Sequence, residues 1–345
     1  MQAFFRLQQC PPLGYRYSVD TGNELLREIR REIEARDGRI TFARFMELAL
    51  YHPQYGYYTS GQERIGKQGD YFTSVSVGSL FGKILAKQFL KYREELGNPA
   101  EFEVVEFGGH GGQFRADVLA AASDLRYGGV EVGDPLPDSI VGCVFSNEFL
   151  DALPVHRVQV RDGAWQEVYV GADVQEKLGP LSTPQLAEYL RDLPIQYMEG
   201  YRSEVNLRAL DWLEDVARRL KRGWIVTIDY GYERNEYFAP HHRDGTLLCY
   251  HNHKKSKNPY TNIGEQDITA HVEFTSLIEQ GKKFGFEAVS FTDQSHYLLQ
   301  IGEAEIAEIV ARTAGQPSKE RAAIHQLIHP EFMGRTFKVL VQRKG

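Results

Sequence analysis

The sequence predicts an α/β protein with an open, mostly parallel sheet. Short apolar runs at 102–107, 141–146 and 224–229 alternate with segments in which apolar residues recur at helix spacing. The run at 224–229 is as apolar as a central strand that is buried on both faces, which is typical of parallel sheets. The run at 102–107 passes through a cluster of glycines into a helix. Strands and helices that alternate in this way are characteristic of sheets with helical crossovers.

The first part of the chain is predicted to be helical. Apolar residues recur at helix spacing from Leu25 to Ile33. A second helix is expected at 42–50, with Thr41 as its N-cap, because a threonine hydroxyl can accept a hydrogen bond from the first helical turn. A third helix is expected from Phe81 to Leu96, where Gly97 ends it.

The middle of the chain is predicted to combine strands with one helix and a hairpin. A helix is expected at 114–122 and a strand at 127–132. The runs at 155–160 and 165–170 flank Asp162-Gly163, a dipeptide that favours the tight turn of a β-hairpin. These segments therefore predict a small antiparallel element beside the parallel sheet.

The last part of the chain is predicted to begin with a long amphipathic helix. Ser203 is the expected N-cap, apolar residues from Leu207 to Leu220 form one face, and Gly223 is the expected end. The elements expected after the strand at 224–229 are helices at 274–284, 306–314 and 320–328, and strands at 286–291 and 336–341.

These elements predict how the chain is divided. We assign 1–22 to a lead-in without regular structure, 23–98 to a helical N-terminal region, and 99–345 to an α/β core with cap insertions at about 155–222 and 231–271.

Composition excludes several classes of protein. The net charge of −7 over 345 residues provides no field to attract nucleic acid. No apolar run reaches the roughly 18 residues of a membrane span. Cys10, Cys143 and Cys249 form no CxxC pair, which fits a reducing compartment. We therefore expect a cytoplasmic protein. A mitochondrial matrix location is the alternative, because the lead-in holds Arg6 and Arg16 and no acidic residue before position 20.

The glycine cluster after the first core strand is a candidate nucleotide-binding turn. Glycines allow a backbone to approach a ligand closely, and a helix N-terminus offers free N–H groups. A dinucleotide fingerprint fails, because Phe114 stands where its third glycine belongs. A pattern typical of S-adenosylmethionine sites fits Glu106, Gly108 and Gly112, although His110 replaces the middle glycine. A tight turn without a ligand is the remaining alternative.

Acidic residues follow the other predicted core strands. Glu131 lies about 20 residues after the glycine cluster, where an acid can hold ribose hydroxyls, or it is an exposed glutamate at a strand end. Asn147, Glu148 and Asp151 follow the strand at 141–146, at the edge where open α/β sheets bind ligands, although a helix N-cap would look similar. Asp229 ends a later strand at the same edge.

Several histidines invite a metal interpretation, which we do not favour. His241, His242, His251, His253 and His271 do not match known zinc spacings. The sequence predicts no metal site.

Taken together, the segments resemble the MidA-type class I methyltransferase family, whose mitochondrial members act as protein-arginine methyltransferases in respiratory complex I assembly. The resemblance rests on 42–53 with 55–58, 69–74 with 80–82, 105–108 with its glycine turn, 147–155, 229–232, and 243–247 through 264–272.

The resemblance implies a Rossmann-like methyltransferase sheet, S-adenosylmethionine as cofactor, and a protein arginine as acceptor, in a complex I subunit if the protein is mitochondrial. The cofactor-binding residues that we expect are Glu106, Gly108, Gly109, Gly112, Glu131, Thr73 and Ser74. The catalytic residues that we expect are Glu148 and Asp151, which would hold a guanidinium group, with Asn147 beside them.

One departure from the family pattern affects the cofactor site. Members of the family carry a helix and a strand between the ribose acid and the Asn-Glu motif, but here only 133–140 separate Val132 from the next strand. We therefore expect a sheet that lacks one outer strand and helix, with the strand at 127–132 at its edge. The alternative function is that of a non-catalytic binding or assembly factor with a degraded cofactor pocket.

Overall fold

The computed structural model describes residues 21–60, 74–191, 193 and 198–345, which form two compact units. Unit 1 comprises Met1–Tyr71, Asp151–Leu210 and Glu233–Glu273, and unit 2 comprises Phe72–Leu150, Asp211–Tyr232 and Phe274–Gly345. Residues 74–98 thus belong with the sheet of unit 2, whereas the sequence grouped them with the N-terminal helices.

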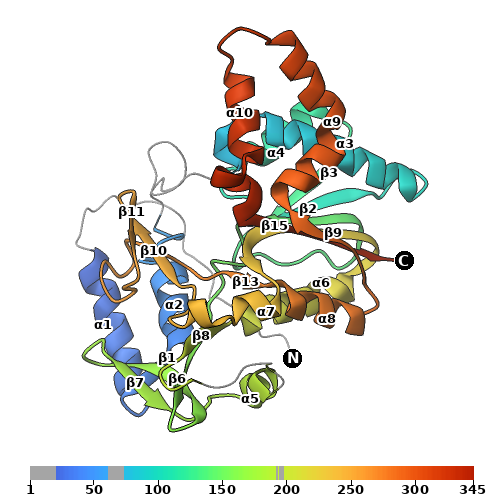
Figure 1. Ribbon diagram of the computed structural model, residues 1–345. Coiled ribbons are helices and arrows are strands. Elements are labelled where there is room, and N and C mark those ends of the chain that lie inside the picture. The colour runs from blue at the N-terminus through green and yellow to red at the C-terminus, as the bar shows by residue number, and fades with distance from the viewer. Residues whose placement is uncertain (1–20, 61–73, 192, 194–197) are drawn as a thin grey trace. The chain divides into compact units, whose positions relative to one another are not determined.

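Unit 2 holds the predicted α/β sheet, in the order β14-β15-β9-β4-β2-β3 (Figure 1). The pairs between β9, β4, β2 and β3 are parallel, and β15 is antiparallel to both of its neighbours. The strands are β2 (Glu103–Phe107), β3 (Arg126–Val130), β4 (Ile140–Asn147), β9 (Leu220–Tyr232), β14 (Glu287–Asp293) and β15 (Phe337–Lys344).

The path of strands ends at β3, which confirms the predicted edge strand. Among the described residues of unit 2, no outer strand follows β3, and residues 131–139 lead directly into β4. The carboxyl end of β3 is therefore joined to β4 by a short connection that contains no helix or strand.

Helices cover the sheet of unit 2 on both faces. Helices α3 (Leu80–Glu95), α4 (Gln113–Ala121), α9 (Gln294–Arg312) and α10 (Lys319–Ile328) lie on one face, with α8 (Phe274–Lys283) and most of α6 (Leu207–Arg219) on the other (Figure 1). The apolar side chains of α3, α4, α9 and α10 form a core with the sheet, in which Tyr92 stacks on Trp224 with ring centroids 4.2 Å apart. Burial of such large rings is a main source of stability.

Unit 1 consists of small antiparallel sheets and helices. One sheet has the order β1-β6-β5-β8 with β7 on β6, and a second has the order β11-β10-β12. The predicted hairpin is confirmed, and Asp162 and Gly163 at its tip both have positive φ. The strands are β1 (Arg39–Thr41), β5 (His156–Arg161), β6 (Ala164–Gly171), β7 (Glu176–Gly179), β8 (Arg202–Val205), β10 (Leu248–His251), β11 (Lys254–Ser256) and β12 (Asp267–Thr269).

The helices of unit 1 pack on a core of their own. Thr41 caps α2 as predicted, because its hydroxyl accepts a hydrogen bond from the backbone N–H of Arg44 at 3.2 Å. The core includes Phe42, Phe45 and Met46 of α2, which are fully buried. The helices are α1 (Thr21–Glu34), α2 (Phe42–Tyr51), α5 (Pro184–Arg191) and α7 (Arg234–Tyr237).

The structure corrects the expected ends of the long helix. Ser203 lies in β8, and Asn206 caps α6 by accepting a hydrogen bond from the N–H of Ala209 at 2.9 Å. Gly223 lies inside β9, where a Cβ atom would come within 1.9 Å of the carbonyl oxygen of Gly142. This glycine therefore permits two strands to approach closely and does not end a helix.

The helix expected at 306–314 begins much earlier, at Gln294. Asp293 caps it, with a carboxylate oxygen 2.9 Å from the N–H of His296. Gly302 lies mid-helix, where a Cβ atom would press on Ile84 at 2.9 Å, so close helix packing accounts for this glycine.

In the parts of the chain that the structure describes, no helix is long and apolar enough to cross a membrane.

Candidate functional site

The glycine turn lies between β2 and α4 in unit 2. Gly108 has φ +69°, its N–H donates to the carbonyl of Val130 at 3.1 Å, and a Cβ atom there would meet the Phe149 ring at 2.8 Å. Gly112 has φ +68° at the N-cap of α4. Cβ atoms at Gly111 and Gly112 would meet no atom of the described residues within 4 Å. The turn therefore has the backbone form that only glycine adopts easily, and it leaves open space beside the helix N-terminus.

The Glu106 carboxylate is buried beside this turn. The hydroxyl of Tyr127 donates a hydrogen bond to Glu106 Oε2 at 2.9 Å. Burial raises the pKa of Glu106 to about 7, although the hydrogen bond from Tyr127 opposes the shift. A Cβ atom at Gly109 would lie 2.6 Å from the Glu106 carboxyl carbon. Gly109 is thus required by the position of this carboxylate.

Glu131 lies beside the glycine turn. It follows β3 directly, and its carboxylate accepts a hydrogen bond from the backbone of His110 in the glycine turn. Its own N–H is bonded to Asp134 at 2.9 Å. The structure therefore brings together Glu106, the glycine turn and Glu131 at the carboxyl ends of two parallel strands, where the sequence predicted a ligand.

The end of β4 presents a strained glutamate. Glu148 has φ +52°, a left-handed conformation that is uncommon for residues other than glycine. Glu148 Oε1 accepts two hydrogen bonds, from Asn147 Nδ2 at 3.0 Å and from the N–H of Ser74 at 3.1 Å. Asn147 Oδ1 is buried and accepts no hydrogen bond within the described part of the chain. Strain of this kind persists only where the surroundings fix it, and it clusters at functional sites.

Asp229 holds this turn in place. It is fully buried at the end of β9, and its Oδ2 accepts hydrogen bonds from the N–H groups of Phe149 at 3.2 Å and Leu150 at 2.9 Å. The sequence predicts the position of Asp229 at this edge but indicates no role for it. The signal that could have revealed it is a carboxylate at the end of an otherwise apolar central strand.

The remaining predicted site residues are placed as follows. Ser74 is fully buried, and its hydroxyl donates to Gln294 Oε1 at 3.1 Å. Asp151 belongs to unit 1, where it is buried and its carbonyl accepts a hydrogen bond from Ala270 at 2.9 Å. Thr73 lies outside the described residues.

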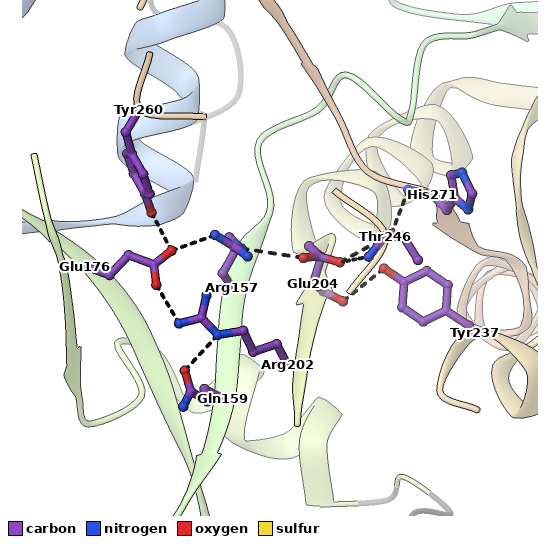
Figure 2. Close-up of polar contacts among 9 residues, drawn as sticks. All are labelled: Arg157, Gln159, Glu176, Arg202, Glu204, Tyr237, Thr246, Tyr260 and His271. Carbon is purple, nitrogen blue, oxygen red and sulfur yellow. Dashed lines mark hydrogen bonds and ion pairs between the residues drawn. The ribbon is translucent and has the colours of Figure 1, made fainter. Parts of the chain in front are cut away.

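Unit 1 contains a buried network of charged side chains (Figure 2). Arg157 pairs with Glu176 at 2.8 Å and with Glu204 at 3.5 Å. Glu204 Oε2 also accepts a hydrogen bond from the N–H of Thr246 at 2.7 Å, and a Cβ atom at Gly245 would lie 2.3 Å from Glu204 Oε1. This network explains why the family segment at 243–247 contains glycine followed by threonine.

The aromatic and acidic family segments meet inside unit 1. The hydroxyl of Tyr58 donates to Asp267 at 2.8 Å, and Asp267 is buried. Tyr51 is also buried and donates to the carbonyl of Ala152 at 3.0 Å. These tyrosines therefore pack and form hydrogen bonds within the unit.

One group of histidines comes together in the structure. Within the described ranges, possible ligand atoms of Glu236, His241 and His242 lie within 4.8 Å of one another, on an exposed local turn. This group does not include His251 or His253, which the sequence analysis also considered.

Comparison with known proteins identifies the class. Residues 130–292 match the family model described as "Putative S-adenosyl-L-methionine-dependent methyltransferase". A crystal structure of a COG1565 superfamily member from Burkholderia thailandensis, bound to S-adenosyl-homocysteine, superposes with a TM-score of 0.86 at 29% identity, covering 96% of this chain and 95% of that one.

Curated relatives match over nearly the whole chain. The rat protein named "Protein arginine methyltransferase NDUFAF7, mitochondrial" is 25% identical, covering 95% of this chain and 88% of its own length. The Drosophila melanogaster homologue is also 25% identical, with coverages of 93% and 85%. The rat alignment spans 401 positions, more than the 345 residues of this chain, so some positions of the relative have no counterpart here.

The fold, the glycine turn and these relatives define an S-adenosyl-L-methionine-dependent methyltransferase. Within that class, the chain is similar to the COG1565 superfamily member and to the curated relatives over most of its length, and its cofactor is S-adenosylmethionine. The residues present fit this cofactor, because the turn has room beside Gly111 and Gly112 and because Asn147 Oδ1 is a buried acceptor to which none of the described residues donates.

Proposed function

We propose that this methyltransferase acts on arginine side chains of a protein. The observation that carries the proposal is the Glu148 carboxylate, which two N–H donors fix at the sheet edge in a strained backbone conformation. The names of the curated relatives, which are protein arginine methyltransferases, support the same acceptor.

The cofactor would be held by the residues that surround the glycine turn. We assign Glu106 and Asn147 to the amino-acid end of the cofactor, because a carboxylate and a buried carbonyl oxygen suit a cationic ammonium group. Gly108, Gly109 and Gly112 give the backbone its close approach, and Glu131 suits ribose hydroxyls. When bound, the cofactor supplies an electrophilic methyl group.

Glu148 would orient the acceptor. A guanidinium group remains charged at all physiological pH values, and its nitrogens are weak nucleophiles. A carboxylate that is already fixed can hold the guanidinium in one orientation and draw positive charge away from the reacting nitrogen. The hydrogen bonds from Asn147 and Ser74 fix Glu148 before the acceptor arrives. A similar role for Asp151 remains a prediction from the sequence.

The acceptor is proposed to be a protein, and a respiratory complex I subunit is the finer proposal that the family resemblance supports. The curated relatives are named as mitochondrial proteins, which favours the mitochondrial matrix alternative for this chain. The non-catalytic alternative receives no support from these relatives.

The proposal can be tested with isotopically labelled S-adenosylmethionine and degenerate peptide libraries. One library carries a fixed arginine and a second carries a fixed lysine. We expect label in the arginine library, identified as methylarginine by mass spectrometry. Glu148→Gln should lower this labelling at least tenfold and leave cofactor affinity unchanged, because it removes charge from the acceptor side only.

Glu94→Gln is the matched control, because Glu94 is an exposed glutamate on α3 of the same unit. It should label arginine at the wild-type rate. Labelling of lysine alone, or no labelling of either library by a protein that binds the cofactor, would contradict the proposed acceptor.

A further inference from the structure

A pair of fully buried polar side chains lies behind Glu148. Ser74 and Gln294 are both 0% exposed, and the Ser74 hydroxyl donates to Gln294 Oε1 at 3.1 Å. Gln294 Nε2 donates in turn to the carbonyl of Leu327 at 3.0 Å. Buried polar groups are stable only when they are satisfied, so this arrangement fixes the position of both side chains.

We propose that Gln294 is a positioning residue for methyl transfer, which acts through Ser74 on Glu148. The inference rests on the proposed role of Glu148. Ser74 uses its hydroxyl for Gln294 and its backbone N–H for Glu148 Oε1. Because both groups belong to one residue, the hydrogen bond to Gln294 restrains the backbone of Ser74 and with it the N–H that holds the carboxylate.

Gln294 is well placed to fix Ser74. It is the first residue of α9, whose N-terminus is capped by Asp293, and its side chain reaches a carbonyl near the end of α10. The amide is thus anchored to two helices, whereas Ser74 lies outside regular helix and strand structure. A rigid support of this kind is what a fixed functional carboxylate needs.

A merely structural glutamine would behave differently, and the chain provides one for comparison. Gln342 in β15 is 2% exposed, and its Nε2 donates to the carbonyl of Leu277 at 3.3 Å. Gln342 pairs with Ile225, four residues before Asp229 in β9, and is therefore farther than Asp229 from the carboxyl end of that strand. Gln294→Met and Gln342→Met thus remove two buried amides, of which only that of Gln294 is bonded to Ser74.

The test compares these two variants in the full chain. With the best peptide from the fixed-arginine library, Gln294→Met should raise the KM for peptide or lower kcat about tenfold, with no change in S-adenosylhomocysteine affinity. Gln342→Met should leave both parameters at wild-type values, even if both variants lose similar thermal stability. Ser74→Ala should reproduce the effect of Gln294→Met, and the double variant should show no further loss, because both residues act in one chain.

A second readout does not depend on the acceptor. Hydrogen exchange of the Ser74 amide, followed by NMR, should become at least tenfold faster in Gln294→Met and stay unchanged in Gln342→Met. If the wild type methylates no arginine, the proposed function fails, yet this exchange still tests the link between Gln294 and Ser74. Unchanged exchange, or equal kinetic effects in the two methionine variants, would overturn the inference.

Discussion

Replacing Glu106 by glutamine is expected to stabilise the protein at alkaline pH while it weakens cofactor binding. Burial raises the pKa of this carboxyl group from 4.5 to about 7 in the folded protein. A raised pKa means that the folded state binds the proton more tightly, so the stabilising contribution of the protonated group is complete below pH 4.5. It is lost as the pH rises from 4.5 through 7.

The size of the effect follows from the shift. A difference of this size between the pKa values of the folded and unfolded states changes the free energy of unfolding by about 3 kcal/mol. At pH 8 the wild type carries an ionised, buried carboxylate, whereas Glu106→Gln keeps a neutral group of the same shape. At pH 8 the free energy of unfolding of Glu106→Gln should therefore exceed that of the wild type by up to about 3 kcal/mol. The two values should become equal near pH 4.

Urea unfolding at pH 4, 6 and 8 measures this difference, and calorimetry with S-adenosylhomocysteine measures the loss of affinity. Glu103→Gln on the same strand is the control, because that side chain is only partly buried and its substitution should change neither measurement strongly. If Glu106→Gln were less stable than the wild type at pH 8, or if the difference did not depend on pH, the account of this carboxylate would be wrong.

Three further substitutions test the packing around the site and the second unit. Gly109→Ala should lower the free energy of unfolding by about 1–3 kcal/mol and abolish cofactor binding, because its Cβ atom would lie 2.6 Å from the Glu106 carboxyl carbon. Gly128→Ala is the control and should be tolerated, because its Cβ atom would meet no described atom within 4 Å. Thermal denaturation compares the two variants. Asp229→Asn should lower the free energy of unfolding in urea by about 2–4 kcal/mol, because it weakens the hydrogen bonds from the backbone N–H groups of Phe149 and Leu150. Wild-type stability would show that the turn does not need the charge. Arg157→Met should lower the free energy of unfolding by about 3–5 kcal/mol in the same measurement, because it removes the cation that pairs with the buried Glu204 carboxylate. Unchanged stability would show that the network is dispensable.

Much of the sheet could be predicted from the sequence because its strands are local apolar runs. The edge position of β3 also followed from sequence, since the residues between Val132 and Ile140 are too few for a helix and a strand. Glycine was harder to interpret. Gly223 and Gly302 are where backbones or helices approach closely, and such approaches involve residues far away in the chain.

The candidate site was predictable only in part, for a similar reason. Glu106 lies near the end of β2, and the glycine turn and Glu131 follow β2 and β3, so their meeting follows from parallel topology. The contact between Ser74 and Gln294 joins residues 220 positions apart, and no local pattern marks it. The role of Asp229 likewise depends on the neighbouring strand, because its partners are backbone N–H groups that carry no sequence signal.

The most direct test of the account is a calorimetric titration of the purified protein with S-adenosylmethionine, beside Glu106→Ala. The central claim is that the site at the ends of β2, β3 and β4 binds the cofactor although the sheet stops at β3. We predict saturable binding to one site, weakened at least tenfold by Glu106→Ala. No saturable heat at several temperatures, from a protein shown to be folded, would contradict the claim.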